Sequence, residues 1–454
     1  MLARPGFLAN NGLSSRLRCQ QRYTSTVQQL LKERQQHKCI YKSRAATYTE
    51  AARGGGIRSM HCSAIHSTEF ETRSPYFRNQ KEEELEPQPL GMDQPYPEIT
   101  EDGYYTISFY SFFVIPEESV AATRDKIQLE WSRDFGVVGR IYVCGEGINA
   151  QLSIPRDNTQ RLREWLESNA IFRGRIPRFN WAIEHRRAFK AFHVRVRPLV
   201  ATGGQLDMET LSHEPQYLDP EEWDSELRAL QAKNKDDPEH QPAPLLIDMR
   251  NNYEARIGKF EGAVCPDVDT FRDEMNAVRE MCKGRAKSEP IYMYCTGGIR
   301  CSVAGAILKT KGYENVKTLK GGVVAYGRHV RGRSDGEKSS LFRGKNFTFD
   351  KRLGETVTSQ VLAACDQCGD PCDVFTNCAN TSCNLLFIQC ASCAEKHHHT
   401  CGSKLCIDRA NMTHDELVKN RMPPIWDYRT RIHPEKVFGR DWIARIEKLA
   451  AAKS

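Results

Sequence analysis

The chain has 454 residues, of which 39% are hydrophobic and 27% are charged. These proportions are typical of a globular protein with two or three domains. No apolar run reaches the roughly 18 residues that a transmembrane helix needs, so no membrane-spanning helix is expected. The net charge of +7 comes from residues 1–60, which contain 11 Lys/Arg and 2 Asp/Glu. The overall charge therefore does not indicate a nucleic-acid-binding face on the rest of the chain.

Residues 1–60 are rich in Arg, Ser and Thr and poor in acidic residues. This composition predicts an amphipathic transit peptide and a mitochondrial location. A disordered basic tail on a cytoplasmic protein is the alternative. Residues 61–102 combine Gly, Pro and clustered charges, which predicts a disordered linker.

Residues 103–205 show strand and helix patterns in alternation. We expect strands at 104–115, within 139–155 (two strands around a glycine turn) and at 189–200, and helices at 116–135 and 156–169. The order β-α-β-β-α-β is that of the split βαβ, so we predict an α+β ferredoxin-like domain.

Residues 206–243 are polar and are interpreted as a connector, and residues 244–335 as an α/β domain. We expect buried strands at 244–250, 290–295 and 315–322, and helices at 268–282 and 301–313. Continuous apolar strands that alternate with helices indicate a parallel sheet. Ligand sites in such sheets lie at the carboxyl ends of the strands.

Cys295 lies at such a strand end, in the sequence YCTGGIRC. A thiol at a helix N-terminus meets exposed amide groups and partial positive charge, which favour the thiolate. Gly297 and Gly298 let backbone N–H groups approach the sulfur, and Arg300 adds a positive charge. The pattern predicts a catalytic nucleophile, against the alternative of an inert buried cysteine. A cysteine phosphatase loop would have five residues between Cys and Arg, and here only four intervene.

The loop, together with LLIDMRNNYEARIGKFEGAV before it and LKGGVVAYGRHV after it, resembles a rhodanese domain. GRIYVCGEGINAQLS and CDQCGDPCDVFTNCANTSCNLLFIQC extend the resemblance, over residues 103–406, to the rhodanese-like tRNA uridine hydroxylase family. The fold expected is therefore an α/β rhodanese domain with a parallel sheet, preceded by the α+β ferredoxin-like domain and followed by a small zinc-binding module.

The resemblance implies 5-hydroxylation of the wobble uridine of tRNA, with molecular oxygen as co-substrate. It assigns catalysis to the loop cysteine, Cys295, which is also the residue on which rhodaneses carry a persulfide. The charge of Arg300 beside the sulfur makes it the second catalytic candidate. The other expected site residues are those of the loop and those that support it from behind. They are Thr296, Gly297, Gly298, Ile299, Cys301, Asp248 and Arg250. Cys301 could resolve an oxidised Cys295 by forming a disulfide, or it could be a small buried residue.

This chain departs from the family at two places. Ser302 stands where a glutamate usually follows the second loop cysteine, and HTCGSKLC replaces a cysteine pair near residue 401. The departures concern substrate details and metal ligation and do not affect the fold expected.

Residues 346–410 contain nine of the 17 cysteines. Without a secretory signal, such a cluster predicts metal binding rather than disulfides. Two Cys-x2-Cys pairs match the spacing of zinc knuckles, and four further cysteines could form a second site. The predicted ligands are Cys365, Cys368, Cys390, Cys393, Cys378, Cys383, Cys401 and Cys406. Cys372 and His397–His399 are possible substitutes, and we expect one or two structural zinc ions.

Residues 185–197 interleave basic side chains with aromatic ones, which suits contacts to phosphates and unstacked bases. The candidate RNA-binding residues are Arg186, Arg187, Lys190, Arg195 and Arg197. A solvated edge of the sheet is the alternative. Residues 411–454 are expected to form an extended tail with one short helix.

Three functions remain open from the sequence. The first is the tRNA uridine hydroxylase, with tRNA as partner and no membrane. The second is a sulfurtransferase that forms a persulfide on Cys295. The third is a non-catalytic binding scaffold, which the intact loop disfavours.

Overall fold

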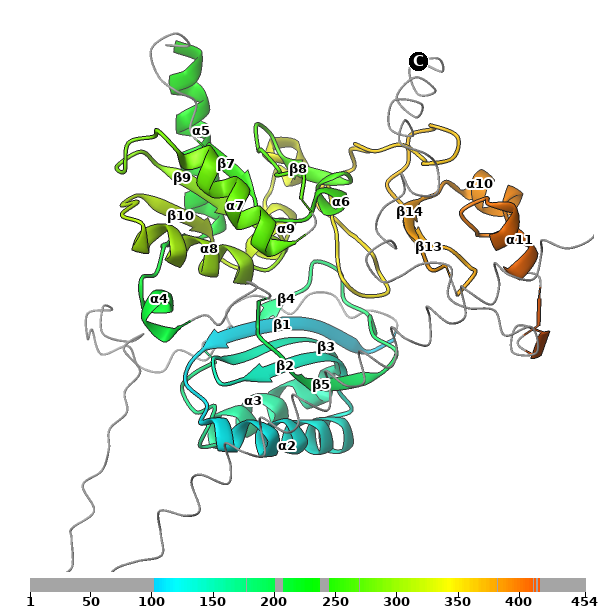
Figure 1. Cartoon of the computed structure of the whole chain (residues 1–454), viewed down its shortest axis with the longest axis horizontal. Helices are drawn as coiled ribbons and strands as arrows, with labels where there is room; N and C mark the ends of the chain where they lie inside the picture. The colour runs from blue at the N-terminus through cyan, green and yellow to red at the C-terminus, as the bar shows by residue number, and fades with distance from the viewer. Residues whose placement is uncertain are drawn as a thin grey trace, which may run out of the picture. The chain divides into compact units, whose positions relative to one another are not determined.

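A computed structural model describes residues 102–176, 178–200, 207–236, 245–268, 270–381, 383–410, 412–413 and 415–416 (Figure 1). These residues all belong to one structural unit, Arg73–Ser454. The predicted transit peptide, most of the predicted linker and the C-terminal tail beyond residue 416 lie outside the described residues. None of the described helices combines the length and the apolarity that crossing a membrane requires.

The N-terminal region forms a five-stranded sheet in the order β4-β1-β3-β2-β5. Its strands are β1 (Tyr104–Phe112), β2 (Val138–Cys144), β3 (Gly147–Pro155), β4 (Asn180–Trp181) and β5 (Phe192–Val196). Helices α2 (Glu117–Phe135) and α3 (Thr159–Ser168) lie on one face of this sheet, and a 3-10 turn, η2 (Arg156–Asn158), precedes α3 (Figure 1). The order of the first four strands is that of the split βαβ arrangement, as predicted.

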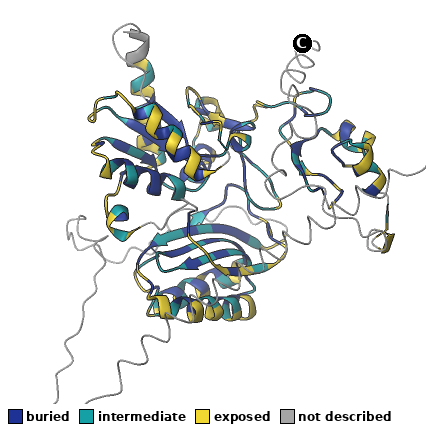
Figure 2. Cartoon of the chain, in the orientation of Figure 1, coloured by how far each residue is buried: buried dark blue, intermediate teal, exposed yellow. Residues whose placement is uncertain are grey.

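Period-two alternation explains which face of this sheet meets the helices. On β1, Tyr105, Ile107 and Phe109 are buried in the core that α2 and α3 share. Successive strand residues point to opposite faces, so Ser108 and Tyr110 face the other way. Figure 2 shows the inner strands largely buried and the outer surface of α2 exposed.

The closing strand of the sheet differs from the prediction. The edge next to β1 is the two-residue strand β4, which pairs antiparallel to β1. The strand predicted at 189–200 is β5, which extends the opposite edge and runs parallel to β2. A two-residue strand carries no periodic pattern, so the sequence could not distinguish the two edges.

The second sheet is parallel, in the order β6-β10-β9-β7. Its strands are β6 (Gln216–Leu218), β7 (Leu245–Asp248), β9 (Ile291–Tyr294) and β10 (Val316–Leu319). One hydrophobic core joins the sheet to α7 (Phe271–Cys282) and α8 (Ile299–Thr310), and another joins it to α5 (Pro220–Asp236) and α9 (Gly322–Gly332). Helices on both faces explain the continuous apolar character of these strands.

The prediction of a connector at 206–243 is wrong. This segment contributes the edge strand β6, which pairs with β10, and helix α5, whose Trp223 is fully buried. Its polar composition reflects the exposed outer surface of α5, and a three-residue strand is too short to be recognised from its pattern.

The remaining elements are short. They are α4 (Met208–Ser212), α6 (Asn252–Ala255), β8 (Gly258–Phe260), η3 (Gly336–Ser339), β11 (Phe342–Asn346), β12 (Glu355–Thr356), β13 (Phe375–Asn377), β14 (Leu386–Ile388), α10 (Ala391–Lys396) and α11 (Lys404–Ala410). Strands β12, β11 and β8 form a small sheet, and β13 pairs with β14. The cysteine-rich region is thus joined to the α/β region through the pairing of β8 with β11.

Candidate active site

Cys295 follows strand β9 directly and is 1% exposed. The backbone N–H of Gly298 donates a hydrogen bond to its Sγ atom at 3.1 Å. Gly298 has φ of 100°, in the left-handed region, and a Cβ atom there would lie 3.0 Å from the Tyr110 hydroxyl. Both the backbone conformation and the close approach therefore call for glycine at this position.

The surroundings of Cys295 stabilise its thiolate. Burial opposes ionisation, but the hydrogen bond from the Cys301 thiol, the charge of Arg300 and the backbone N–H groups of Cys301 and Gly298 outweigh it. Together they lower the pKa of Cys295 to about 5. Burial, together with the hydrogen bond to Cys295, raises the pKa of Cys301 well above its ordinary value. At neutral pH, Cys295 is thus the anion and Cys301 the donor.

Arg300 is held by a residue that the sequence analysis did not single out, Glu254 of α6. The carboxylate of Glu254 is fully buried and accepts two hydrogen bonds from the Arg300 guanidinium, at 2.8 and 3.0 Å. Thr296 Oγ1 donates to the same carboxylate at 3.0 Å. Asn251 and Glu254 form an Asn-x-x-Glu capping box, a sequence pattern that indicates the start of α6. The pattern does not indicate that Glu254 pairs with Arg300.

Asp248 and Arg250 form a completely buried ion pair at 2.7 Å. Arg250 also donates to the carbonyl of Gly258 at 2.6 Å, and the Tyr294 hydroxyl donates to Asp248 at 2.8 Å. Neither residue of the pair is among those that line the cavity at Cys295. They connect β7, β8 and β9 next to the loop.

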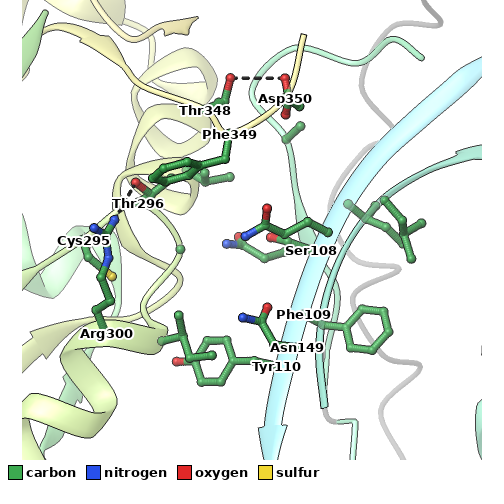
Figure 3. A pocket seen from close by; sticks show the side chains of 18 of the residues that line it. Ser108, Phe109, Tyr110, Asn149, Cys295, Thr296, Arg300, Thr348, Phe349 and Asp350 are labelled. Atoms are coloured by element: carbon green, nitrogen blue, oxygen red, sulfur yellow. Dashed lines mark hydrogen bonds between the residues drawn. The ribbon is translucent and has the colours of Figure 1, made fainter. Parts of the chain in front are cut away.

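A cavity of about 460 Å³ lies in front of Cys295 (Figure 3). The loop contributes Thr296, Gly297, Ile299 and Arg300 to its wall, while Cys301 is not among the lining residues. The opposite wall comes from the N-terminal sheet, where Ser108, Tyr110 and Asn149 face the cavity and the ring of Phe109 points away (Figure 3). The volume is within the range of small-molecule sites, roughly 300–1,000 Å³.

Polar contacts join the N-terminal sheet to α8 and to the start of α9. The Tyr110 hydroxyl and Ser302 Oγ are 2.8 Å apart, and the Tyr217 hydroxyl donates to the same Ser302 atom at 3.1 Å. Asn180 Nδ2 donates to the carbonyl of Gly321 at 2.8 Å. Ser302, the residue at the first family departure, is therefore a hydrogen-bonding link. The sequence offered only the polar alternation of β1 and β3 as a signal for this interface.

Both predicted cysteine tetrads are assembled. The Sγ atoms of Cys365, Cys368, Cys390 and Cys393 lie within 4.8 Å of one another, and so do those of Cys378, Cys383, Cys401 and Cys406. Cys372 and the three histidines belong to neither group. Each tetrad can hold a metal ion.

The basic residues Arg186, Arg187, Lys190, Arg195 and Arg197 are all exposed. Three aromatic residues of this segment are not exposed: Phe189 is buried and lines the cavity, Phe192 packs against the core, and His185 is buried. Burial and the nearby arginines lower the pKa of His185 to about 3. These three rings are used in the fold, whereas the ring of His193, in the same segment, is exposed beside the charges.

Models of three protein families match the chain. They are an acylphosphatase-like domain of the UPF0176 family (residues 104–200), a rhodanese-like domain (226–329) and a rhodanese C-terminal region (343–407). Among solved structures, the chain is similar to the rhodanese-like domain of the Anabaena sp. Alr3790 protein, with 27% identity and a TM-score of 0.19 over 25% of this chain and 73% of that one.

Curated relatives match a larger share of the chain. A tRNA uridine(34) hydroxylase of Leptospira interrogans is 39% identical over 65% of this chain and 76% of its own length. One of Erwinia tasmaniensis is 37% identical over 68% of this chain and 83% of its own. The three family models match the N-terminal, rhodanese and cysteine-rich regions of this chain in that order. The chain therefore belongs to the tRNA uridine(34) hydroxylase family.

Proposed function

We propose that this protein hydroxylates uridine 34 of tRNA and that Cys295 is the nucleophile. The observation that carries the proposal is a thiolate with a pKa of about 5 at the wall of a cavity of about 460 Å³. A base inside a folded anticodon loop cannot reach a buried thiolate, so it has to leave the stack and enter the cavity. The names of the relatives supply the substrate and the position.

The chemistry of uracil favours C5 as the carbon that is hydroxylated. The C5–C6 double bond is conjugated with the C4 carbonyl, so a thiolate adds to C6 and the electron pair moves toward C5 and O4. C5 then becomes the carbon that reacts with an oxidant, for which we propose dioxygen. One oxygen atom enters the base and the other leaves as water. Loss of the C5 proton then restores the C5–C6 double bond, the S–C6 bond breaks, and Cys295 leaves as a thiolate. Reduction of the second oxygen atom to water requires two electrons and two protons, which Cys295 and Cys301 would supply by forming a disulfide.

Two amide side chains on the cavity wall support uracil as the base. Asn180 Nδ2 donates to the Gly321 carbonyl, and Asn149 Nδ2 donates to the Leu199 carbonyl at 3.3 Å. Neither amide oxygen accepts a hydrogen bond from the described residues, so both are available as acceptors. Uracil carries a donor at N3, whereas cytosine carries an acceptor there. Acceptors on the wall therefore favour uracil.

The test is mass spectrometry of nucleosides from tRNA incubated with the purified protein, in air and under nitrogen, with dithiothreitol as reductant. We expect a gain of one oxygen on uridine in air only, and no gain on a matched tRNA with cytidine at position 34. A protein that leaves uridine 34 unchanged in air would contradict the proposal.

The sulfurtransferase remains the second candidate, because the same loop can hold a persulfide anion. The N–H of Gly298 and the charge of Arg300 would stabilise the extra sulfur just as they stabilise the thiolate. Thiosulfate treatment followed by intact-protein mass spectrometry tests it. A persulfide on Cys295, without any oxygen gain on tRNA, would favour this candidate.

We propose that the two cysteine tetrads hold structural zinc. In a tetrahedral Zn–thiolate site with Zn–S of about 2.3 Å, sulfur atoms lie roughly 3.8 Å apart, and Cys368 and Cys390 Sγ are 3.6 Å apart. The backbone N–H groups of Cys390 and Cys401 also donate to Cys365 and Cys378 Sγ, both at 3.4 Å. Zinc would stabilise a region whose small cores consist largely of cysteines.

Elemental analysis of the natively purified protein is therefore expected to find two zinc ions per chain. Cys378→Ser should lower the content to one, because it removes one ligand of a closed site. Cys372→Ser is the matched control, since Cys372 is also buried in this region but belongs to neither tetrad. A wild-type content below two, or a loss in the Cys372 variant, would contradict the assignment.

We propose that the exposed basic residues of 186–197 contact tRNA phosphates. Replacing Arg195 and Arg197, which flank the end of β5, by Ala should weaken tRNA binding. The slope of log K against log salt concentration should fall by roughly 0.7–0.9 for each phosphate that is no longer neutralised. Lys283→Ala, at an exposed position of the α/β region, serves as control. An unchanged slope in the double variant would show that this surface does not bind tRNA.

We propose that residues 1–60 direct mitochondrial import, because they are rich in Arg, Ser and Thr and poor in acidic residues. The relatives named above are bacterial proteins, which fits the cytoplasmic alternative. Expression in yeast of a fluorescent protein fused to residues 1–60 distinguishes mitochondrial import from the cytoplasmic alternative. Mitochondrial fluorescence would support import, and diffuse fluorescence the alternative.

A further inference from the structure

Glu274 of helix α7 is a carboxyl group in the cavity wall that has no role in the chemistry described so far. Its residue is 3% exposed, and it lines the same cavity as Cys295 and Arg300. Its Oε1 atom is buried and has no hydrogen-bond partner among the described residues. Burying a polar oxygen without a partner is costly, so such a group calls for an explanation.

The neighbours of Glu274 keep it neutral. Burial is the largest influence; the negative charges of Glu254, Asp248 and Cys295 act in the same direction and Arg300 in the opposite one. Arg300 already shares its charge with Glu254 through two hydrogen bonds. The pKa of Glu274 is raised to about 8. The titratable and charged groups facing it are Asp248, Glu254, Cys265, Cys295, Arg300 and Cys301.

The cavity therefore holds two ionisable groups with inverted protonation at neutral pH. Cys295 has lost its proton although it is a thiol, and Glu274 keeps its proton although it is a carboxylic acid. A nucleophile with a lowered pKa and an acid with a raised pKa, in one cavity, are suited to acid-assisted addition.

We propose that Glu274 is the proton donor of the cavity and acts on the base that Cys295 attacks. As the S–C6 bond forms, the electron pair of the C5–C6 double bond moves toward the C4 carbonyl oxygen. That oxygen takes the carboxyl proton of Glu274, which becomes a carboxylate. When the carbonyl forms again, its O–H bond breaks and the proton returns to Glu274. The proposal rests on the proposed function, because it requires a base in the cavity.

The test compares Glu274→Gln, which has nearly the same shape but cannot transfer the proton, with Glu280→Gln. Glu280 lies on the same helix, and its side chain is exposed. The Glu274 variant should lose about 10²-fold or more in kcat for tRNA with little change in KM. The Glu280 variant should match the wild type.

A second readout does not require activity. A carboxyl whose folded-state pKa lies above its unfolded-state value destabilises the folded protein increasingly as pH rises between the two values. The Tm of Glu274→Gln relative to wild type should therefore increase from pH 5 to pH 8, and that of Glu280→Gln should not. Such a rise would show that the Glu274 variant folds and that the Glu274 carboxyl group is protonated in the wild type.

Two outcomes would overturn the proposal. If Glu274→Gln shows the rise in relative Tm but keeps its kcat within about threefold of wild type, Glu274 is buried and neutral but not a proton donor. If relative Tm is flat, the carboxyl is not held neutral. The wild-type protein is assayed first. If it does not hydroxylate tRNA, the proposed function itself is contradicted, and the variants are not needed to reach that conclusion.

Discussion

Cys295→Ser is expected to abolish hydroxylation of tRNA, with a loss on the order of 10⁴-fold or more. The surroundings lower the pKa of the Cys295 thiol to about 5. A serine hydroxyl has too high a pKa to ionise there, so the loop would hold a neutral and weakly nucleophilic group. Nucleoside mass spectrometry of tRNA incubated in air with each protein measures the difference.

Cys144→Ser is the matched control for this prediction. Cys144 ends strand β2, is partly buried and does not line the cavity. Its replacement should leave activity unchanged, and tRNA binding should be retained by both variants. Oxygen incorporation by Cys295→Ser at a rate near wild type would exclude Cys295 as the nucleophile.

Glu254→Gln is expected to have the second-largest effect, on stability as well as on reactivity. The carboxylate of Glu254 is fully buried, and its main partner Arg300 is 15% exposed. Removing one charge of a buried pair leaves the other uncompensated, which typically costs about 3–5 kcal/mol. The neutral amide of the variant would also leave more of the Arg300 charge acting on Cys295, so the pKa of Cys295 should fall. Chemical denaturation and the pH dependence of iodoacetamide alkylation measure the two effects.

The stability difference should also depend on pH. Burial alone would raise the pKa of Glu254, but Arg300 and Arg250 lower it below its ordinary value. The charge of Glu254 therefore stabilises the folded protein above its unfolded-state pKa, and this contribution is lost as pH falls through the folded-state value. The difference between wild type and Glu254→Gln should shrink in acid.

Glu261→Gln is the matched control for Glu254→Gln. Glu261 pairs with Arg343 at 2.7 Å, but its side chain is 48% exposed. Exposed pairs contribute about 0–1 kcal/mol, so this variant should be nearly neutral. If the two variants lost equal stability, or if the pKa of Cys295 did not change in Glu254→Gln, the positioning role of Glu254 would be refuted.

The order of the elements and the identity of the loop could be predicted from the chain alone. Period-two and helical patterns located β1, β2, β3, β7, β9 and β10, because these strands have a buried face that only apolar residues can fill. The cysteine spacing likewise predicted the two tetrads that the fold assembles. The short strands β4 and β6 were missed because two or three residues carry no period.

Features that depend on local pattern could be read from the chain: the main elements, the position of Cys295 in a loop between a strand and a helix, and the spacing of the clustered cysteines. The surroundings of that loop could not, because they come from distant parts of the chain. Asn149 and Tyr110 lie opposite each other on strands β3 and β1, on the face away from α2 and α3, and no motif in the sequence marks them as site residues. The structure turns this face toward Cys295. Glu254 and Glu274 resembled ordinary helix carboxylates until the fold buried both beside Arg300. Burial depends on which surfaces meet, and residues far apart in the chain establish those contacts.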